Sequence, residues 1–226
     1  MSNHCYICNE PSISDEHIPP QCLFPESKDL PSGFNFRKNL ITVPSCAEHN
    51  LRKSGDDEYL LFVLVSNFNV NSVGLHHWRT KIRRAMQKRP SKRGIFHNPQ
   101  RVQYQGKETG AYSIDFERLK RQFDFICRGI YFFHFNEPWN HDIDLVIPFA
   151  LSRASGQNQK YNQAMTKLIN LVSQSLEHES VLGENPEVFY YQYKLKAESP
   201  GFMMKMVFYN GIEVAAISES KDKGLQ

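Results

Sequence analysis

The residues best suited to chemistry are two pairs of metal-binding side chains. Cys5 and Cys8 are separated by two residues, and so are Cys46 and His49. At this spacing a tight turn or a helix start lets both side chains of a pair reach one tetrahedral Zn²⁺ ion. One such pair is weak evidence, but two pairs at domain distance predict a Cys₃His structural zinc site. His4 is kept as an alternative to His49 for the fourth ligand.

The other cysteines and histidines are assigned less specialised roles. The chain has five cysteines, an odd number, which argues against a disulfide framework and for a reducing compartment. We therefore expect Cys22 and Cys127 to be free thiols that pack. Adjacent His76 and His77 would point to different sides of a helix, so we expect them at its surface or in contact with phosphate.

The residues between the two pairs, and the residue directly after the second pair, occur in an order that resembles the motif of a nuclease family. Asp15-Glu16-His17-Ile18-Pro19-Pro20 follows the first pair, Asn39-Leu40 precedes the second, and Asn50 directly follows it. This order is similar to the zinc-containing branch of the HNH (ββα-metal) endonucleases, which includes phage recombination endonucleases that resolve branched DNA. The resemblance covers about a quarter of the chain, residues 5–57. It implies a zinc-stabilised ββα-metal module there.

The resemblance also implies roles for individual residues. His17 matches the general base, and a neutral imidazole near pH 7 can take a proton from the attacking water. Glu16 and Asn50 match the protein ligands of a catalytic divalent ion, for which Mg²⁺ or Mn²⁺ is expected. Asn39 matches the asparagine that braces the loop orienting the histidine. Glu16 stands where the family more often has aspartate, so Asp15 is kept as a substitute ligand.

Positive charge is concentrated in one stretch of the chain. The formal net charge is +3, but residues 59–107 contain no Asp or Glu and carry +10, which leaves −7 for the remainder. Such segregation indicates a polyanionic partner, and phosphate neutralisation is the main source of nucleic-acid affinity. We expect nucleic acid, DNA in particular, to contact these cations, although a solvated helix face is the alternative. The candidate nucleic-acid contacts are Lys53, Arg79, Lys81, Arg83, Arg84, Lys88, Arg89, Lys92 and Arg93.

The hydrophobic pattern predicts an α+β fold. A helix is expected over 56–68, where acidic residues precede an apolar body. Three-and-four spacing of apolar residues predicts helices over 74–88 and within 114–135, and another helix is expected over 159–177. The segment 91–110 is polar and interrupted by Gly and Pro, which predicts a linker or long loop with a short strand near 101–104. Strands are expected over 188–195, 202–209 and 212–217, with Asn210-Gly211 as a two-residue hairpin turn.

These elements suggest three segments. Residues 1–58 would form the nuclease module, residues 59–110 a basic helical segment with a linker, and residues 111–226 an α+β domain of unknown task with an antiparallel hairpin. The C-terminal segment is also where a second copy or a partner subunit is expected to dock. The longest apolar run has seven residues, 59–65, far below the roughly 20 that a membrane span needs, so a cytoplasmic protein without membrane contact is expected.

The favoured function is therefore metal-dependent hydrolysis of phosphodiester bonds in DNA. The alternative is a non-catalytic, zinc-stabilised adaptor that binds nucleic acid or protein. An adaptor would need the four zinc ligands but would have no use for His17, Glu16 and Asn50, and the chain has all of them. Defence against foreign DNA is a role of many small HNH proteins and is an expectation from the resemblance. No base-reading motif was identified in the sequence.

Overall fold

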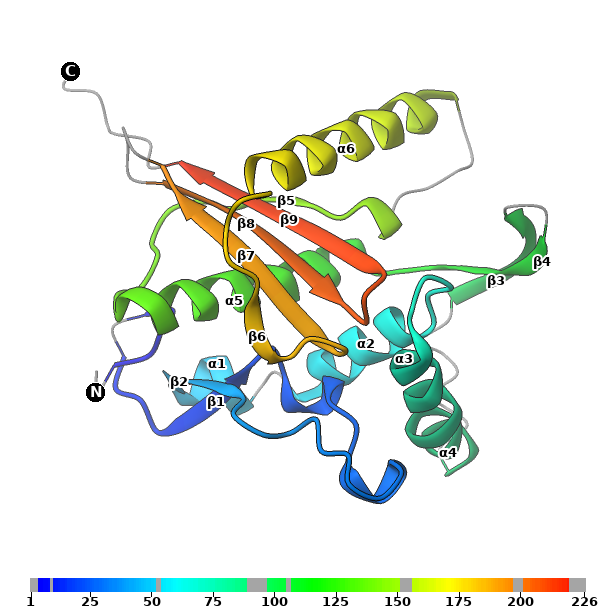
Figure 1. Cartoon of the computed structure of the whole chain (residues 1–226), viewed down its shortest axis with the longest axis horizontal. Coiled ribbons are helices and arrows are strands. Elements are labelled where there is room, and N and C mark those ends of the chain that lie inside the picture. Colours follow the sequence, from blue (N-terminus) through cyan, green and yellow to red (C-terminus); the bar gives the residue numbers. More distant parts are fainter. Residues whose placement is uncertain are drawn as a thin grey trace.

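The helices and strands of this protein are arranged in layers around one long helix (Figure 1). A computed structural model describes residues 4–8, 10–51, 54–88, 97–104, 107–150, 156–196 and 201–219. In order, the layers are an N-terminal strand–strand–helix unit, helix α5 (Phe116–Phe135), a five-stranded sheet and helix α6 (Gly156–Ser175). This mixture of helix and sheet confirms the predicted α+β class.

The N-terminal unit consists of two short strands followed by a helix. Strand β1 (Ser14–Ile18) pairs antiparallel with β2 (Ile41–Ser45), and His17 lies opposite Thr42. The connection contains two 3-10 helices, η1 (Gln21–Leu23) and η2 (Ser27–Asp29). After β2 the chain turns directly into α1 (Ala47–Leu51).

The basic helical segment differs in detail from its prediction. Helix α2 (Ser54–Val65) is followed by α3 (Ser72–His77), a π-helical turn η3 (Trp78–Ile82) and α4 (Arg83–Lys88). Helix α3 begins before Gly74 because the Asn71 side chain caps it and accepts the Gly74 N–H at 3.0 Å. The π turn inserts a residue and changes which side chains face inward. In α3, before this turn, His77 is fully buried, whereas Leu75 is 41% exposed.

The surface position expected for His77 was therefore wrong. The Tyr209 hydroxyl donates to the Leu23 carbonyl at 2.5 Å, so His77 Nδ1, 3.3 Å away, must donate to the Tyr209 oxygen. Burial, with help from the cations Lys81 and Arg37, lowers the pKa of His77 to about 3. The neutral ring thus joins α3 to the segment after β1. His76 is half-buried, with its Nε2 on the Asp29 carbonyl.

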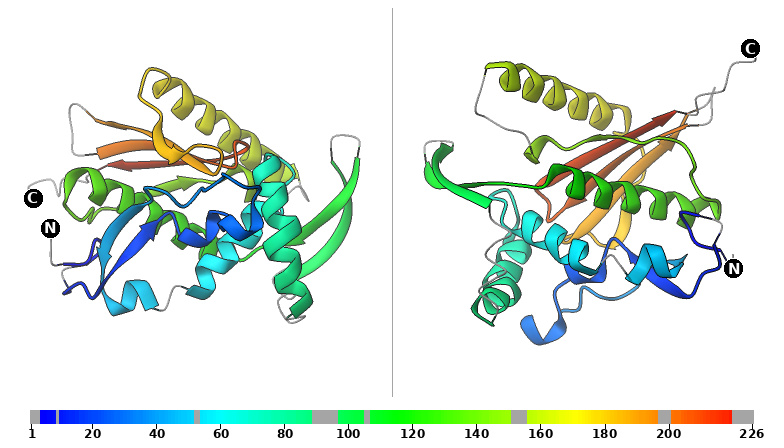
Figure 2. Two further views of the ribbon diagram at one scale, coloured as in Figure 1. Left: turned by 60° about the horizontal axis from the view of Figure 1, so that its bottom comes forward. Right: turned by 180° about the vertical axis from the view of Figure 1, so that it is seen from behind.

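The predicted linker contains a β-ribbon. Strands β3 (His97–Tyr104) and β4 (Lys107–Ser113) pair antiparallel and, among the described strands, only with each other. Pro99 fits because the pairing register shifts between His97 and Gln100, where Asn98 has a φ of +47°. The ribbon projects from the body at the end occupied by α3 and α4 (Figure 2).

The C-terminal part is an antiparallel sheet between two helices. Its strand order is β5-β9-β8-β7-β6, formed by β5 (Asp144–Val146), β6 (Leu182–Asn185), β7 (Phe189–Leu195), β8 (Gly201–Phe208) and β9 (Ile212–Glu219). The short 3-10 helix η5 (Pro148–Ala150) follows β5. The three predicted strands are confirmed, and the helices predicted within 114–135 and over 159–177 lie at 116–135 and 156–175. Phe208 pairs with Ile212, so three residues rather than two form the β8–β9 turn. None of the described helices combines the length and apolar character needed to cross a membrane.

Alternation along the strands explains the two faces of the sheet. On β8, Phe202, Met204 and Met206 belong to the core shared with α5. On β9, Ala215 and Ile217 instead pack with α6. Successive residues of a strand point to opposite faces, so the sheet contributes side chains both to the core shared with α5 and to the packing against α6.

One buried core connects the N-terminal unit with the C-terminal sheet. It includes Cys5, Ile18, Ile82 and Phe208, which come from all three predicted segments. Helix α5 lies between the unit and the sheet, and a Cβ atom added at Gly129 of α5 would fall 2.6 Å from Ile18 Cγ1. The glycine therefore allows α5 to approach β1 next to His17.

We expect Gly129→Ala to lower the free energy of unfolding. Overpacking against Ile18 costs about 1–3 kcal/mol, partly offset by about 1 kcal/mol of improved helix propensity. Gly55→Ala is the matched control, because that helical glycine has Arg118 Nη2 at 3.8 Å as its nearest neighbour and should keep the gain. Urea unfolding of both variants measures the difference. Equal stability would show that Ile18 moves aside without cost.

Candidate metal centre and adjoining strand

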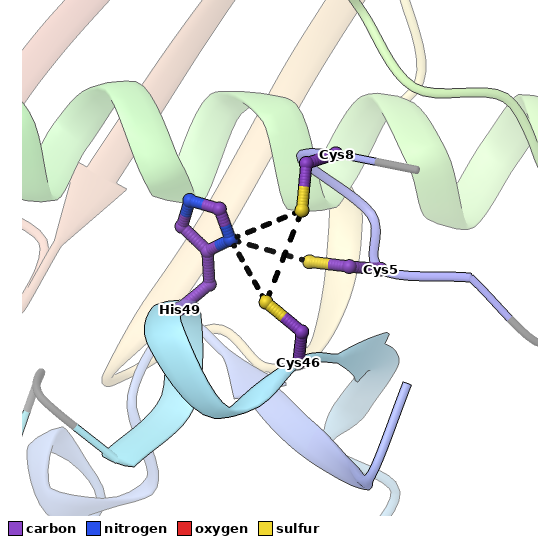
Figure 3. Close-up of side chains that lie close together, drawn as sticks. All are labelled: Cys5, Cys8, Cys46 and His49. Atoms are coloured by element: carbon purple, nitrogen blue, oxygen red, sulfur yellow. Dashed lines mark hydrogen bonds between the residues drawn. The ribbon is translucent and has the colours of Figure 1, made fainter. Parts of the chain in front are cut away.

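The predicted zinc ligands lie together (Figure 3). His49 Nδ1 is 3.5 Å from the sulfurs of Cys5 and Cys8 and 3.2 Å from that of Cys46, and the Cys8 and Cys46 sulfurs are 3.8 Å apart. Tetrahedral Zn–S bonds of about 2.3 Å and Zn–N bonds of about 2.0 Å would put sulfurs about 3.8 Å apart and nitrogen about 3.5 Å from sulfur. The cluster could therefore hold a metal ion such as zinc.

Local structure explains how the four side chains converge. Cys46 immediately precedes α1 and His49 lies within it, so one helical turn brings both to the same side. The first pair lies in a turn in which the Cys5 N–H donates to the Glu10 carbonyl at 2.9 Å, and the Tyr6 N–H fixes that turn to Pro44 of β2 at 2.9 Å. His4, the alternative ligand, is exposed, pairs with Pro11 in a β-bridge and is not in the cluster.

The surroundings of Cys5 suit a thiolate. Burial raises the pKa of the Cys5 thiol, but backbone amides of Ile7, Cys46 and Cys8 outweigh it and leave the pKa below its ordinary value. Amide N–H groups directed at a sulfur stabilise its anionic form, which is the metal-binding form. By contrast, Cys22 and Cys127 are unpaired and pack into or against the core, as predicted.

Asn50 and Glu16 are associated with the same face of β1. Asn50 directly follows His49, and its side-chain amide donates to Ser14 Oγ at 2.5 Å. Ser14 and Glu16 are two residues apart on the strand and share a face. Glu16 is only 6% exposed, and the Tyr6 hydroxyl lies 3.5 Å from its Oε2. The structure thus brings the two predicted ligands of the divalent ion to one side of the strand.

His17 lies on the opposite face of β1, together with Asp15. It is half-buried, and Gln21 Nε2 lies 3.4 Å from His17 Nε2. An amide nitrogen can only donate, so this contact needs a lone pair on His17 Nε2. Burial and the nearby Arg37 cation lower the pKa of His17 below 6.5, more than Glu16 and Asp15 raise it. The imidazole is therefore neutral at pH 7.

Asn39 ends the connection between the two strands. It is exposed, has a φ of +50° and lies two residues before β2. Asparagine tolerates this left-handed conformation better than most residues. The neighbouring Lys38 carbonyl accepts a hydrogen bond from Asn185 Nδ2 of the C-terminal sheet at 3.0 Å. The bracing role of the Asn39 side chain stays a prediction.

Two of the predicted nucleic-acid contacts also bind carboxylates. Arg84 makes a bidentate ion pair with Asp29, with both N–O distances 2.7 Å, and Lys81 lies 3.7 Å from Glu26. These pairs attach the basic helices to the segment after β1. Arg79, Arg83 and Lys88 are exposed, whereas four further candidates lie outside the described residues: Lys53, Arg89, Lys92 and Arg93.

Arg37 also belongs to this site, although no sequence motif contains it. Its Nε donates to the Phe24 carbonyl at 3.0 Å, and its Nη2 is 3.6 Å from Glu26. Its cation lowers the pKa of His17 across the β1–β2 connection. Only the fold brings this arginine near the histidine, twenty residues away, and no local motif marks it.

Comparison of the chain with models of protein families, with curated proteins and with solved structures found no match.

Proposed function

We propose that this protein is a metal-dependent endonuclease of the HNH class that hydrolyses phosphodiester bonds in DNA. One observation supports the proposal: in α1, directly after His49 of the cluster, Asn50 contacts Ser14 of β1, two residues from Glu16 and three from His17. The acid and the amide lie on one face of a short strand–helix unit, and the neutral imidazole lies on the opposite face of the same strand. These are the groups needed to bind an ion and activate water.

His17 is the general base of the proposed reaction. The lone pair on His17 Nε2, toward which the Gln21 amide donates in the structure, takes a proton from the water that attacks phosphorus. Glu16 and Asn50 would hold a Mg²⁺ or Mn²⁺ ion, which supplies Lewis acidity and stabilises the leaving oxygen. Asp15 is the substitute ligand and shares the face of His17. Zinc at Cys5, Cys8, Cys46 and His49 is structural, because all four tetrahedral positions come from the protein.

The exposed cations of the basic helices support the choice of nucleic acid as substrate. Arg79, Arg83 and Lys88 face solvent in a stretch of 49 residues, 59–107, that contains no acidic residue. They can neutralise the backbone phosphates of the strand being cut.

Cleavage of supercoiled plasmid tests the proposal. The purified protein is incubated with Mg²⁺, Mn²⁺ or EDTA at low and moderate salt. We expect nicked or linear product with either ion and none with EDTA. Intact plasmid in every condition, with zinc confirmed bound, would instead favour the non-catalytic adaptor.

The pH dependence of cleavage is a second expected result. The rate should rise with pH as the His17 imidazole loses its proton, with a midpoint below 6.5 because burial and Arg37 lower its pKa. Arg37→Met removes the cation and should move this acid limb to higher pH, whereas Arg37→Lys should leave it in place. Initial rates from pH 4.5 to 8.5 measure the limb. If Arg37→Met leaves the acid limb of the pH–rate profile unchanged, the general base is a group other than His17.

A further inference from the structure

The β3–β4 ribbon is an exposed arm that nothing in the proposed site uses. Asn98, Gln100, Arg101 and Gln103 are all exposed, and side chains on both faces of the ribbon reach solvent. The base of the ribbon is anchored to the body, because the Tyr112 hydroxyl forms a hydrogen bond with Ser66 Oγ beside α2. The Tyr112 side chain is partly buried there, and this burial raises its pKa to about 12. The arm is thus fixed at one end and open beyond it.

An open two-stranded ribbon needs an explanation. Two strands without a packed face are only marginally stable in water, so such an arm is expected to bind something in the working protein. Apart from Pro99, the exposed side chains of its described residues are polar: three amides, the Arg101 guanidinium, the Glu108 carboxylate, His97 and Ser113. Large aromatic and aliphatic groups, which form the centre of protein–protein interfaces, are not among them. This composition favours a polar, hydrogen-bonding partner over a second copy of the chain.

We propose that the β3–β4 ribbon enters the major groove of duplex DNA. The inference rests on the proposed function and narrows its substrate from DNA in general to duplex DNA. The groove is about 12 Å wide and admits a two-stranded ribbon, whose strands lie about 4.8 Å apart. Eight residues of β3 span about 26 Å, enough to follow the groove across several base pairs.

The chemistry of the exposed side chains matches the groove. Arginine pairs in a bidentate manner with guanine, and glutamine or asparagine with adenine. Arg101 and Gln103 alternate with Gln100 and therefore lie on one face, with Gln100 on the other. Glu108 is the one acid in the ribbon sequence, and its Oε1 lies 3.2 Å from Arg101 Nη1. The ribbon also lies at the end of the acid-free stretch, at the same end of the molecule as α4 (Figure 2).

Binding by the uncut complex tests the inference. The full chain carrying His17→Ala is titrated into a fluorescein-labelled 24-base-pair duplex and into one of its strands, and anisotropy is followed at two salt concentrations. We expect Arg101→Ala with Gln103→Ala to weaken duplex binding about tenfold and single-strand binding less than twofold. Glu108→Gln should strengthen duplex binding, because it frees Arg101 and removes a negative charge.

A matched pair of exposed residues provides the control. Arg121→Ala with Gln174→Ala removes the same groups from α5 and α6 and should leave both affinities within twofold. Unchanged duplex affinity of the ribbon variant, or equal losses for duplex and single strand, would overturn the inference. The inference would also be overturned if sedimentation showed that the parent is a dimer and that the ribbon variant is a monomer with unchanged duplex affinity.

Failure of the inference is distinguishable from failure of the proposed function. A parent protein that cuts plasmid while the ribbon variant binds duplex as the parent does would overturn only the ribbon. A parent that never cuts, but loses duplex affinity on substitution of the ribbon, would overturn only the nuclease.

Discussion

His17→Ala is expected to slow plasmid cleavage about 10²- to 10⁴-fold, the usual contribution of a positioned general base. The substitution removes the only proton acceptor that the proposal assigns to the attacking water. It leaves the cations of η3 and α4 in place, so the KM for DNA should stay within about threefold. His17 is half-buried on a two-stranded sheet, and thermal unfolding should change little. Single-turnover rates with Mg²⁺ measure the effect.

His178→Ala is the control for this experiment. His178 is exposed beyond α6, far along the chain from β1, and its removal should not change the rate. If His17→Ala cuts as fast as the parent under matched metal and salt, the proposed mechanism is wrong. Cleavage lost in both variants would point to a general effect on folding.

Cys46→Ser is expected to release the bound zinc and to destabilise the N-terminal unit. Cys46 joins β2 to α1, and its sulfur is one of the four groups that meet in the cluster. Structural zinc supplies about 10–16 kcal/mol of apparent binding free energy in zinc-finger peptides. If about 4 kcal/mol of this is lost here, a chain of this size should unfold roughly 10 °C lower. Plasmid cleavage should also fall, because Asn50 depends on α1.

Zinc content by mass spectrometry and differential scanning calorimetry test this result. The matched control is Cys22→Ser, since Cys22 lies outside the cluster and its sulfur only donates to the Asp57 carbonyl. That variant should keep one zinc per chain. A Cys46→Ser protein that retains a full equivalent of zinc would contradict the assignment, and so would a parent protein whose unfolding temperature is insensitive to EDTA.

The metal cluster was predictable because its determinants are local. A pair of ligands two residues apart brings its own geometry, so the sequence needed only to contain two pairs. The helices at 116–135 and 156–175 were predictable for the same reason, because apolar residues at helical spacing form one face of the helix, which packs against the core. In each case the signal lies within one ligand pair or one helix.

The features that were missed depend on contacts between distant parts of the chain. His77 is buried because Tyr209, 132 residues away, accepts its hydrogen bond, and no pattern in the helix indicates this. The ribbon was predicted only as a linker or long loop with a short strand near 101–104, because Gly and Pro normally interrupt strands. That strand lies within β3, and the register shift accommodates Pro99. Arg37 approaches His17 only after the β1–β2 connection has folded.

The approach of α5 to β1 bears on how such a protein could evolve by recombination. Ile18 lies over Gly129, and the Leu23 carbonyl accepts its hydrogen bond from Tyr209. A gene fusion that transferred only the codons for the first 58 residues would leave Ile18 facing water and that carbonyl without its donor. The segment with the four metal-binding side chains is therefore not a unit that can be transferred alone, and α5 with the C-terminal sheet would have to be inherited with it.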